Sequence, residues 1–156
     1  MPNNAHSERG GSRTEFAIRR ICNGDEEAVA DLWRLCGLVR PWNDPLNDIG
    51  SARINASSEI FVAVTGDTGI VAGSVMAGYD GHRGWVYYVA VAPEHRGQRL
   101  GKRLMRHAET WLRKLGAHKI MLMIRENNVE VRQFYEGLGY EIEKRMVMSC
   151  WKDRKK

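Results

Sequence analysis

The sequence predicts a single α/β (α+β) domain organised around a mixed β-sheet, and three observations lead to that prediction. Strand-like and helix-like segments alternate along the chain, no segment is repeated, and no linker-like stretch divides the 156 residues. The composition, 43% hydrophobic and 28% charged, is ordinary for a globular protein. A chain of this length buries roughly two-thirds of its unfolded surface, which is enough for one substantial core.

The first part of the chain is predicted to hold a strand and two helices. Residues 1–14 are rich in Asn, Ser, Gly and Arg and are expected to be disordered, so the folded domain would span residues 15–156. Residues 15–21 alternate like a strand. Asp25 is then placed to cap a helix that Gly37 ends. A proline-containing loop after it leads into a short second helix.

The remaining chain is predicted to alternate strands with helices. A Gly-Asp-Thr-Gly turn within residues 59–80 predicts a β-hairpin, and the apolar run 85–91 predicts a strand buried on both faces. From Leu100 to Leu115 the apolar residues recur at helical spacing. The last elements are expected to be a buried strand, a helix capped by Asn128, and a final strand or hairpin, over residues 118–124, 128–139 and 140–151.

The cysteines and the hydropathy pattern indicate a cytoplasmic protein. Cys22, Cys36 and Cys150 are odd in number and lack the spacing of metal ligands, so free thiols and no metal site are expected. The polar N-terminal segment has no apolar core of a secretory signal. No uncharged run reaches the about 18 residues that a membrane span needs, so no membrane partner is expected.

The stretch PEHRGQRLGKRLM, residues 93–105, carries the clearest chemical signal. It joins an apolar strand to a helix through a glycine-containing turn, where several backbone N–H groups lack intrahelical partners. Seven basic residues stand against one acid between Arg96 and Lys114, and the net charge of the chain is +5. A phosphate group suits such a turn. Neither the Walker loop nor the G-x-G-x-x-G fingerprint is present.

Two segments, VYYVAVAPEHRGQRLGKRLM and NNVEVRQFYEGLGYE, together with the order of elements, resemble the GNAT superfamily of N-acetyltransferases over residues 16–151. The motifs RPWNDP and GYDGHRG are most similar to the YpeA-like bacterial acetyltransferases. The resemblance implies a mixed, mostly antiparallel sheet of six to seven strands with about four helices. The sheet would splay at its centre, between strands 85–91 and 118–124. Acetyl-CoA would be the co-substrate.

The resemblance assigns the cofactor mainly to main-chain groups. Val89 and Val91 would bond the pantetheine arm like an added strand, and an amide here would polarise the thioester carbonyl. The pyrophosphate cradle would consist of Gly97, Gln98, Arg99, Leu100, Gly101 and Lys102, and Arg96, the first residue of the family pattern, would also belong to the cofactor site. Arg99 stands where the family pattern, Gln/Arg-x-x-Gly-x-Gly/Ala, has its middle glycine. An arginine in helical backbone conformation would still present its amide.

Asn128 and Tyr135 match the Asn and Tyr of the family helix, seven residues apart. Two helical turns contain about 7.2 residues, so both side chains would face one side. The resemblance implies that Asn128 contributes to the cofactor site and that Tyr135 is the general acid for the departing thiolate of coenzyme A. The competing interpretation is that Tyr135 packs as one aromatic of a core-facing stripe.

No general base is identified. The carboxylates that different GNAT subgroups carry would fall at Met123 or Trp85, which cannot act as bases. Two loops supply candidates that would bind or deprotonate an ammonium group and wall its pocket, namely Trp42, Asp44, Tyr79 and Asp80. Aspartates also start turns, which is the competing explanation for both carboxylates.

The function expected from these features is transfer of an acetyl group from acetyl-CoA to a primary amine of a small molecule or protein. Attack would be direct, within a ternary complex. An acyl-CoA-binding sensor without turnover stays open because the family's base carboxylates are missing. A basic nucleic-acid-binding domain is a weaker alternative, since no exposed aromatic platform is evident. The acceptor is undetermined, and the resemblance is compatible with a homodimer.

Overall fold

The computed structural model of the protein describes residues 14–152. The expected disordered segment, residues 1–14, lies outside that range except for Thr14. The chain divides between Met123 and Ile124 into two compact units, and its organisation as one domain from residue 15 to 156 stays a prediction. Among the described residues, no helix combines the length and the hydropathy that crossing a bilayer requires.

The first unit is built on a mixed five-stranded sheet in the order β1-β2-β3-β4-β5. The pairs β1–β2, β2–β3 and β3–β4 are antiparallel, whereas β5 runs parallel to β4. Their bounds are Phe16–Arg20 for β1, Ser58–Thr65 for β2, Val71–Tyr79 for β3, Gly84–Val91 for β4 and Ile120–Leu122 for β5. The predicted mixed, mostly antiparallel sheet is thereby confirmed.

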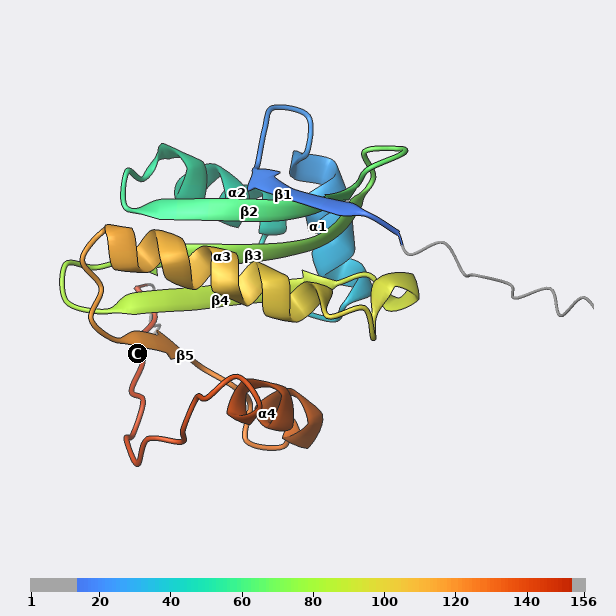
Figure 1. Cartoon of the computed structure of the whole chain (residues 1–156). Coiled ribbons are helices and arrows are strands. Elements are labelled where there is room, and N and C mark those ends of the chain that lie inside the picture. Colours follow the sequence, from blue (N-terminus) through green and yellow to red (C-terminus); the bar gives the residue numbers. More distant parts are fainter. Residues whose placement is uncertain (1–13, 153–156) are drawn as a thin grey trace, which may run out of the picture. The chain divides into compact units, whose positions relative to one another are not determined.

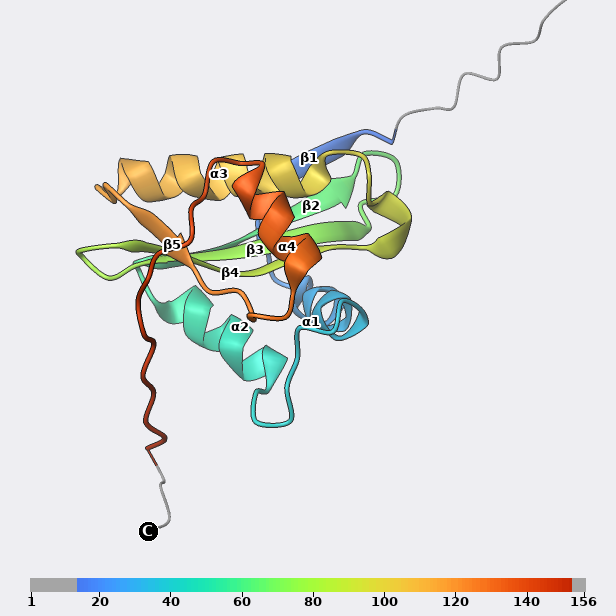
Figure 2. The same ribbon diagram turned by 90° about the horizontal axis from the view of Figure 1, so that it is seen from below.

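Helices cover both faces of this sheet. Helix α3 (Leu100–Lys114) lies on one face, and α1 (Glu26–Leu35) and α2 (Pro45–Ile54) lie on the other (Figures 1 and 2). The predicted start of α1 is found at Asp25, although its carboxylate bonds Arg19 and the Cys22 amide and makes no capping bond to the helix. At the start of α2 the Asp44 side chain accepts from the Leu46 amide. The proline at the first position of α2 suits a helix start because its ring fixes φ and its missing N–H would have no partner there.

Strand β2 is buried on both faces over residues 60–65. The prediction of burial on both faces for residues 85–91 is wrong, because Tyr87 of β4 is exposed and several of its neighbours are half-buried. Ile60 and Val62 belong to the buried cluster that contains Trp33 of α1. The intervening Phe61 points to the other face, where its ring centre lies 4.6 Å from that of His107 in α3. This strand therefore ties the two helical layers to one sheet.

The sheet opens between β4 and β5, as the resemblance implies. The two strands pair only between Gly84–Val86 and Ile120–Leu122, and β4 then continues to Val91 without β5 beside it. β5 has only three residues, which are half-buried rather than buried, because it pairs on one side with a short piece of β4. The edge of β4 beyond Val86 is where main-chain groups are released from this pairing.

A bulge interrupts the other side of β4. Tyr87 pairs with Met76 of β3, but the next paired position is Ala90 with Ser74, so the register skips Tyr88 and Val89 of β4. Tyr88 has a φ of +50°, in the left-handed region. Such a bulge bends a strand and re-aims the groups that follow it.

The second unit, residues 124–152 as described, contains α4 (Val129–Glu136). The Asn128 side chain accepts from the Val131 amide at 3.3 Å, which confirms the predicted cap. Within residues 14–152, α4 joins α1, α2 and α3 to give four α-helices, in agreement with the expected number, and a short 3₁₀ turn, Pro93–His95, precedes α3. In α4 the burial falls on Tyr135.

The predicted final strand or hairpin over residues 140–151 is wrong: no strand forms there, and the sheet has five strands rather than six to seven. Apolar residues do recur in this segment, but Ile142, Met146 and Met148 are exposed. A strand exists only where its N–H and C=O groups find a partner strand, and an apolar pattern does not specify one.

Candidate active site

The bend before α3 adopts a conformation that most residues avoid. Gly97 has a φ of +76° and Arg99 a φ of +60°, so both are left-handed. Glycine adopts this conformation without strain, whereas for arginine it costs about 1 kcal/mol. The sequence allowed a helical arginine here, and the structure makes it left-handed instead, as the N-cap of α3. Leu100, the first helical residue, anchors the bend in the core with 1% exposure.

The bend presents main-chain donors that the first unit does not use. Within residues 14–123 the amides from Gly97 to Lys102 donate no hydrogen bond, and the first such bond is from the Arg103 amide to the Arg99 carbonyl, 3.1 Å. A Cβ atom added at Gly97 would meet nothing within 4 Å, so no side chain fills the space beside this residue of the bend. These donors and the positive end of the helix dipole favour an anion.

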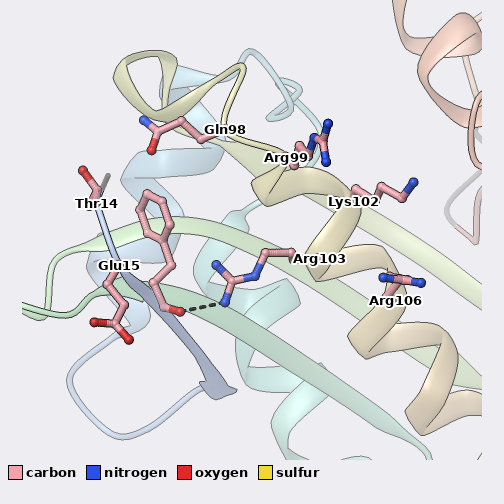
Figure 3. Close-up of a pocket in the computed structure, with 8 residues that line it drawn as sticks. Thr14, Glu15, Gln98, Arg99, Lys102, Arg103 and Arg106 are labelled. Carbon is pink, nitrogen blue, oxygen red and sulfur yellow. Dashed lines mark hydrogen bonds between the residues drawn. The ribbon is translucent and has the colours of Figure 1, made fainter. Parts of the chain in front are cut away.

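A basic depression of about 600 Å³ flanks the bend, between the start of β1 and the first turns of α3 (Figure 3). Glu15 is the acid in its lining, and one guanidinium, that of Arg103, is held by the Phe16 carbonyl at 2.8 Å. The lining residues are Thr14, Glu15, Phe16, Gln98, Arg99, Lys102, Arg103 and Arg106. The predicted cradle residues Gln98, Arg99 and Lys102 therefore belong to a positively charged surface.

The other main-chain groups of the predicted cofactor site lie along the open edge of β4. The Ala92 amide donates to the Ala72 carbonyl in β3 at 2.9 Å. Because backbone groups alternate along a strand, those of Val91 point to the opposite edge. The Val91 carbonyl accepts from Arg96 Nε at 3.3 Å, and Arg96 Nη2 also lies 3.9 Å from Cys36 Sγ. Arg96 thus folds back against β4 rather than into the bend.

Tyr88 connects the bulge of β4 to the opposite helical layer. Its hydroxyl donates to Asp48 Oδ2 at 2.6 Å and accepts from Asn43 Nδ2 at 3.1 Å. Its ring stacks on Trp33, with ring centres 3.9 Å apart and planes 7° apart. Burial and the bond to Asp48 raise the pKa of Tyr88 to about 12, so the phenol stays protonated.

A buried serine, Ser74, connects Trp33 to the main chain of Tyr88. Trp33 Nε1 donates to Ser74 Oγ at 2.8 Å, and the Ser74 hydroxyl contacts the Tyr88 carbonyl at 3.4 Å. Trp33 and Ser74 are both fully buried. Sequence analysis did not find this cluster, because its members, Trp33, Ser74 and Tyr88, lie far apart in the chain.

The loop with Trp42 and Asp44 comes close to β4 through Asn43, which lies between them in sequence. The Trp42 side chain is 64% exposed. The Asp44 carboxylate accepts from the Leu46 amide at 3.0 Å, so it starts the helix in the way that its competing explanation required. A carboxylate with one such bond on an exposed residue still has lone pairs for a second donor. This loop is therefore the predicted acceptor segment that contacts β4 at its bulge.

Tyr79 and Asp80 lie at the other end of β4, where Tyr79 pairs with its first residue, Gly84. The Asp80 carboxylate accepts from the amides of His82 and Arg83, and its second oxygen accepts from Trp85 Nε1. Bonds from Arg83, then His82, then Trp85 lower the pKa of Asp80 to about 2. The structure gives Asp80 a turn-closing role and does not bring it together with the Trp42–Asp44 loop.

The second unit carries the predicted general acid. Tyr135 is 8% exposed, and its ring contacts those of Phe134 and Tyr140 with centres 5.0 and 5.7 Å apart. Burial raises the pKa of Tyr135 to about 12. Asn128 acts as the helix cap in this unit, and its contribution to the cofactor site stays a prediction.

Comparison with protein families gives a match to the acetyltransferase (GNAT) family over residues 26–140, most of the chain. This chain belongs to the GNAT family. An acetyltransferase of Pectobacterium atrosepticum is 45% identical to it over 124 residues, 80% of this chain and 86% of the relative. An acetyltransferase of Sodalis glossinidius is 41% identical over 131 residues, 84% of this chain and 91% of the relative.

Solved acetyltransferases share the GNAT fold. An acetyltransferase of Trypanosoma brucei matches with a TM-score of 0.68 at 25% identity, over 88% of this chain and 100% of its own. The aminoglycoside N-acetyltransferase AAC(6')-Iy, in a complex with coenzyme A, matches with a TM-score of 0.75 at 17% identity, over 90% and 97%. The protein is an N-acetyltransferase. The likeness to the YpeA-like group stays a prediction.

Proposed function

We propose that this GNAT enzyme transfers the acetyl group of acetyl-CoA to a primary amine of a small molecule or a protein, by direct attack within a ternary complex. The observation that carries the proposal is the open bend from Gly97 to Lys102, whose amides have no acceptor within residues 14–123, beside the unpaired edge of β4. A diphosphate supplies acceptors for several convergent amides, and an extended amide chain suits a free strand edge.

The residues of the first unit divide this work between the two ends of the cofactor. The segment from Gly97 to Lys102 binds the pyrophosphate through its main-chain N–H groups. Val89 and Val91 bond the pantetheine arm along β4, and an amide at the bulge polarises the thioester carbonyl as charge develops on its oxygen. The fold shared with AAC(6')-Iy, which binds coenzyme A, supports this assignment.

Tyr135 acts as the general acid. Its raised pKa keeps the phenol protonated at neutral pH, as a proton donor to the departing thiolate requires. Asn128, two turns before it, belongs to the cofactor site as the family spacing implies. If Tyr135 has only a packing role, removal of its hydroxyl alone should cause no loss of turnover.

The acceptor amine binds at the loop of Trp42 and Asp44. Asp44 offers a carboxylate to the ammonium form, and Trp42, which is 64% exposed, contributes an aromatic ring of the kind that attracts cations. Tyr79 and Asp80 are the second candidate pair, weakened because three donors already occupy the Asp80 carboxylate. The amine loses its proton before attack, to a carboxylate or through water.

A decisive experiment follows thermal unfolding during titration with acetyl-CoA and coenzyme A, with ATP as the control for any polyanion. A ligand at a hundred times its Kd stabilises by about 2.7 kcal/mol, which is easily seen. No shift at millimolar acetyl-CoA would contradict the proposal. Thiol release with a panel of amino acids, peptides, polyamines and aminoglycosides then identifies the acceptor, and binding without release to any of them favours the sensor alternative.

Two glycine variants make the experiment specific for the bend. Gly97→Ala and Gly69→Ala both place a Cβ on a left-handed residue, with φ of +76° and +68°, and in neither case does the Cβ meet an atom within 4 Å. Their strain is therefore similar, about 1 kcal/mol. Only Gly97→Ala is expected to weaken coenzyme A binding, because Gly69 lies in the β2–β3 turn.

A further inference from the structure

Tyr88 is the residue at which four separate segments meet the cofactor strand. Its ring packs on Trp33 of α1, its hydroxyl bonds Asn43 of the loop and Asp48 of α2, and its carbonyl contacts Ser74 of β3. The contacts come from both the ring and the main chain, and the hydroxyl has two polar partners of its own. Core packing explains the ring but does not explain this pair of partners.

The backbone at Tyr88 needs such support. A tyrosine at a φ of +50° is strained, and a residue of this kind persists only when its surroundings hold it. The conformation occurs inside the bulge, where the register with β3 skips Tyr88 and Val89. Because successive backbone groups of a strand face opposite sides, a shift of one position here would turn the Val89 amide to the other side.

We propose that Tyr88 is a positioning residue for acetyl transfer. Its hydroxyl, held between Asn43 and Asp48, connects the β4 bulge to the loop of Trp42 and Asp44. This connection fixes the bulge and so aligns the Val89 main chain. The kinetic part of this inference rests on the proposed function, whereas the coupling of loop and bulge does not. Asn43 lies between Trp42 and Asp44, so an amine bound at that loop would act on the bulge through one side chain.

The direction of the hydrogen bonds supports a fixed arrangement. Asp48 accepts from the Tyr88 hydroxyl at 2.6 Å, a short bond to a carboxylate, which is stronger than a bond between neutral groups. Asn43 donates to the same oxygen, so both the proton and a lone pair of the hydroxyl are engaged. The hydroxyl therefore has one preferred orientation, which a phenylalanine could not reproduce.

The test uses Tyr88→Phe, which keeps the ring and its stacking on Trp33. Tyr87→Phe is the matched control, since Tyr87 is the neighbouring, 40% exposed tyrosine of the same strand. Ile49→Val is the stability control, because it removes one buried methylene from α2 without touching the hydrogen bonds. Amide hydrogen exchange is measured on the ligand-free proteins, and thiol release from acetyl-CoA is measured with the most active amine of the panel.

Tyr88→Phe should raise exchange about tenfold in residues 40–48 and at Ala90, which pairs with Ser74 next to the bulge, the scale of one lost bond to a carboxylate, and leave β2 unchanged. It should lower kcat about tenfold with the KM for acetyl-CoA within about twofold, because the pyrophosphate bend is intact. In a cycle with Asp48→Ala, which breaks the same bond, the effects should be clearly less than additive. Both control variants should keep the wild-type kcat.

Exchange at Ala90 that does not change in Tyr88→Phe would overturn the coupling, whatever the activity. Increased exchange with a wild-type kcat, or an equal fall of kcat in Ile49→Val, would overturn the positioning role. A wild-type protein that neither binds acetyl-CoA nor releases thiol would refute the proposed function instead, and the exchange of the ligand-free variants would still decide whether loop and bulge are coupled.

Discussion

Two glycines beneath α3 provide a sharp test of how the bend is positioned. Gly73 of β3 lies under the first turns of the helix, where an added Cβ would come within 2.9 Å of Leu104 Cδ1 and 3.0 Å of the Ala90 carbonyl oxygen. Gly84 of β4 lies under the other end, where a Cβ would be 3.0 Å from Leu112 Cδ1. Alanine at either glycine therefore overpacks the contact between the sheet and α3.

The expected losses of stability are similar and the expected losses of affinity differ. An extra methyl group in a packed core costs about 1–3 kcal/mol, and each 1 kcal/mol lowers the Tm of a chain of this size by about 2–4 °C. Gly73→Ala also has to displace the Ala90 carbonyl, a main-chain group of the strand that we propose binds the pantetheine arm, and to push the start of α3 away from the sheet. We expect it to weaken coenzyme A binding about tenfold, which corresponds to about 1.4 kcal/mol.

The assay is thermal unfolding of both variants together with calorimetric titration of coenzyme A. Gly84→Ala should lose stability but keep its Kd within about twofold, because the helix end that it displaces is remote from the bend. Equal losses of affinity in the two variants would refute the reasoning, since a general loss of stability would then explain both. An unchanged Kd in a destabilised Gly73→Ala would refute it as well.

Three further predictions follow from single residues. In urea unfolding, Arg99→Gly should be about 1–2 kcal/mol more stable than Arg99→Ala. Both variants lack the guanidinium group, but only glycine adopts the left-handed φ without strain. The reverse order of stability would contradict a left-handed backbone at residue 99. Tyr135→Phe should lower kcat about a hundredfold with little change in KM, and the wild-type rate should show no alkaline decline from Tyr135 below about pH 10, since its pKa is raised to about 12. An unchanged kcat would leave Tyr135 with packing alone. The pKa of Asp80 is lowered from 3.8 to about 2, so its turn should persist as the pH falls through 3.8 and be lost only as the pH approaches 2; carboxyl NMR that finds a midpoint near 3.8 would show that the bonds from Arg83, His82 and Trp85 are absent.

The elements that sequence could predict are those whose pattern follows directly from burial. Residues 60–64 of β2 are all apolar because both faces of the strand are covered there, and α3 has its apolar stripe because it rests on one face of the sheet. The bend could also be predicted from local sequence, because glycines, basic residues and a helix start occur together in residues 96–102. The resemblance to the GNAT family then predicted acetyl-CoA as the co-substrate and the splay between β4 and β5.

The features that escaped prediction depend on partners far apart in the sequence. Nothing local to Tyr88 indicates that it takes a left-handed φ, because its ring and hydroxyl partners come from α1, the Asn43 loop and α2. The same holds for the segment 140–151, whose apolar alternation suggested a strand without providing a strand to pair with. Asp80 has the local sequence of a turn, and its carboxylate is engaged by that turn.

The central claim is that main-chain amides of the bend bind the diphosphate of coenzyme A. The direct measurement is a titration of the ¹⁵N-labelled protein with coenzyme A, followed by the amide signals of Gly97–Lys102. We expect these signals to shift together and saturably, along with those of Val89 and Val91, and to shift less in Gly97→Ala. Binding that leaves the bend signals unmoved while shifting those of Tyr79 and Asp80 would contradict the claim.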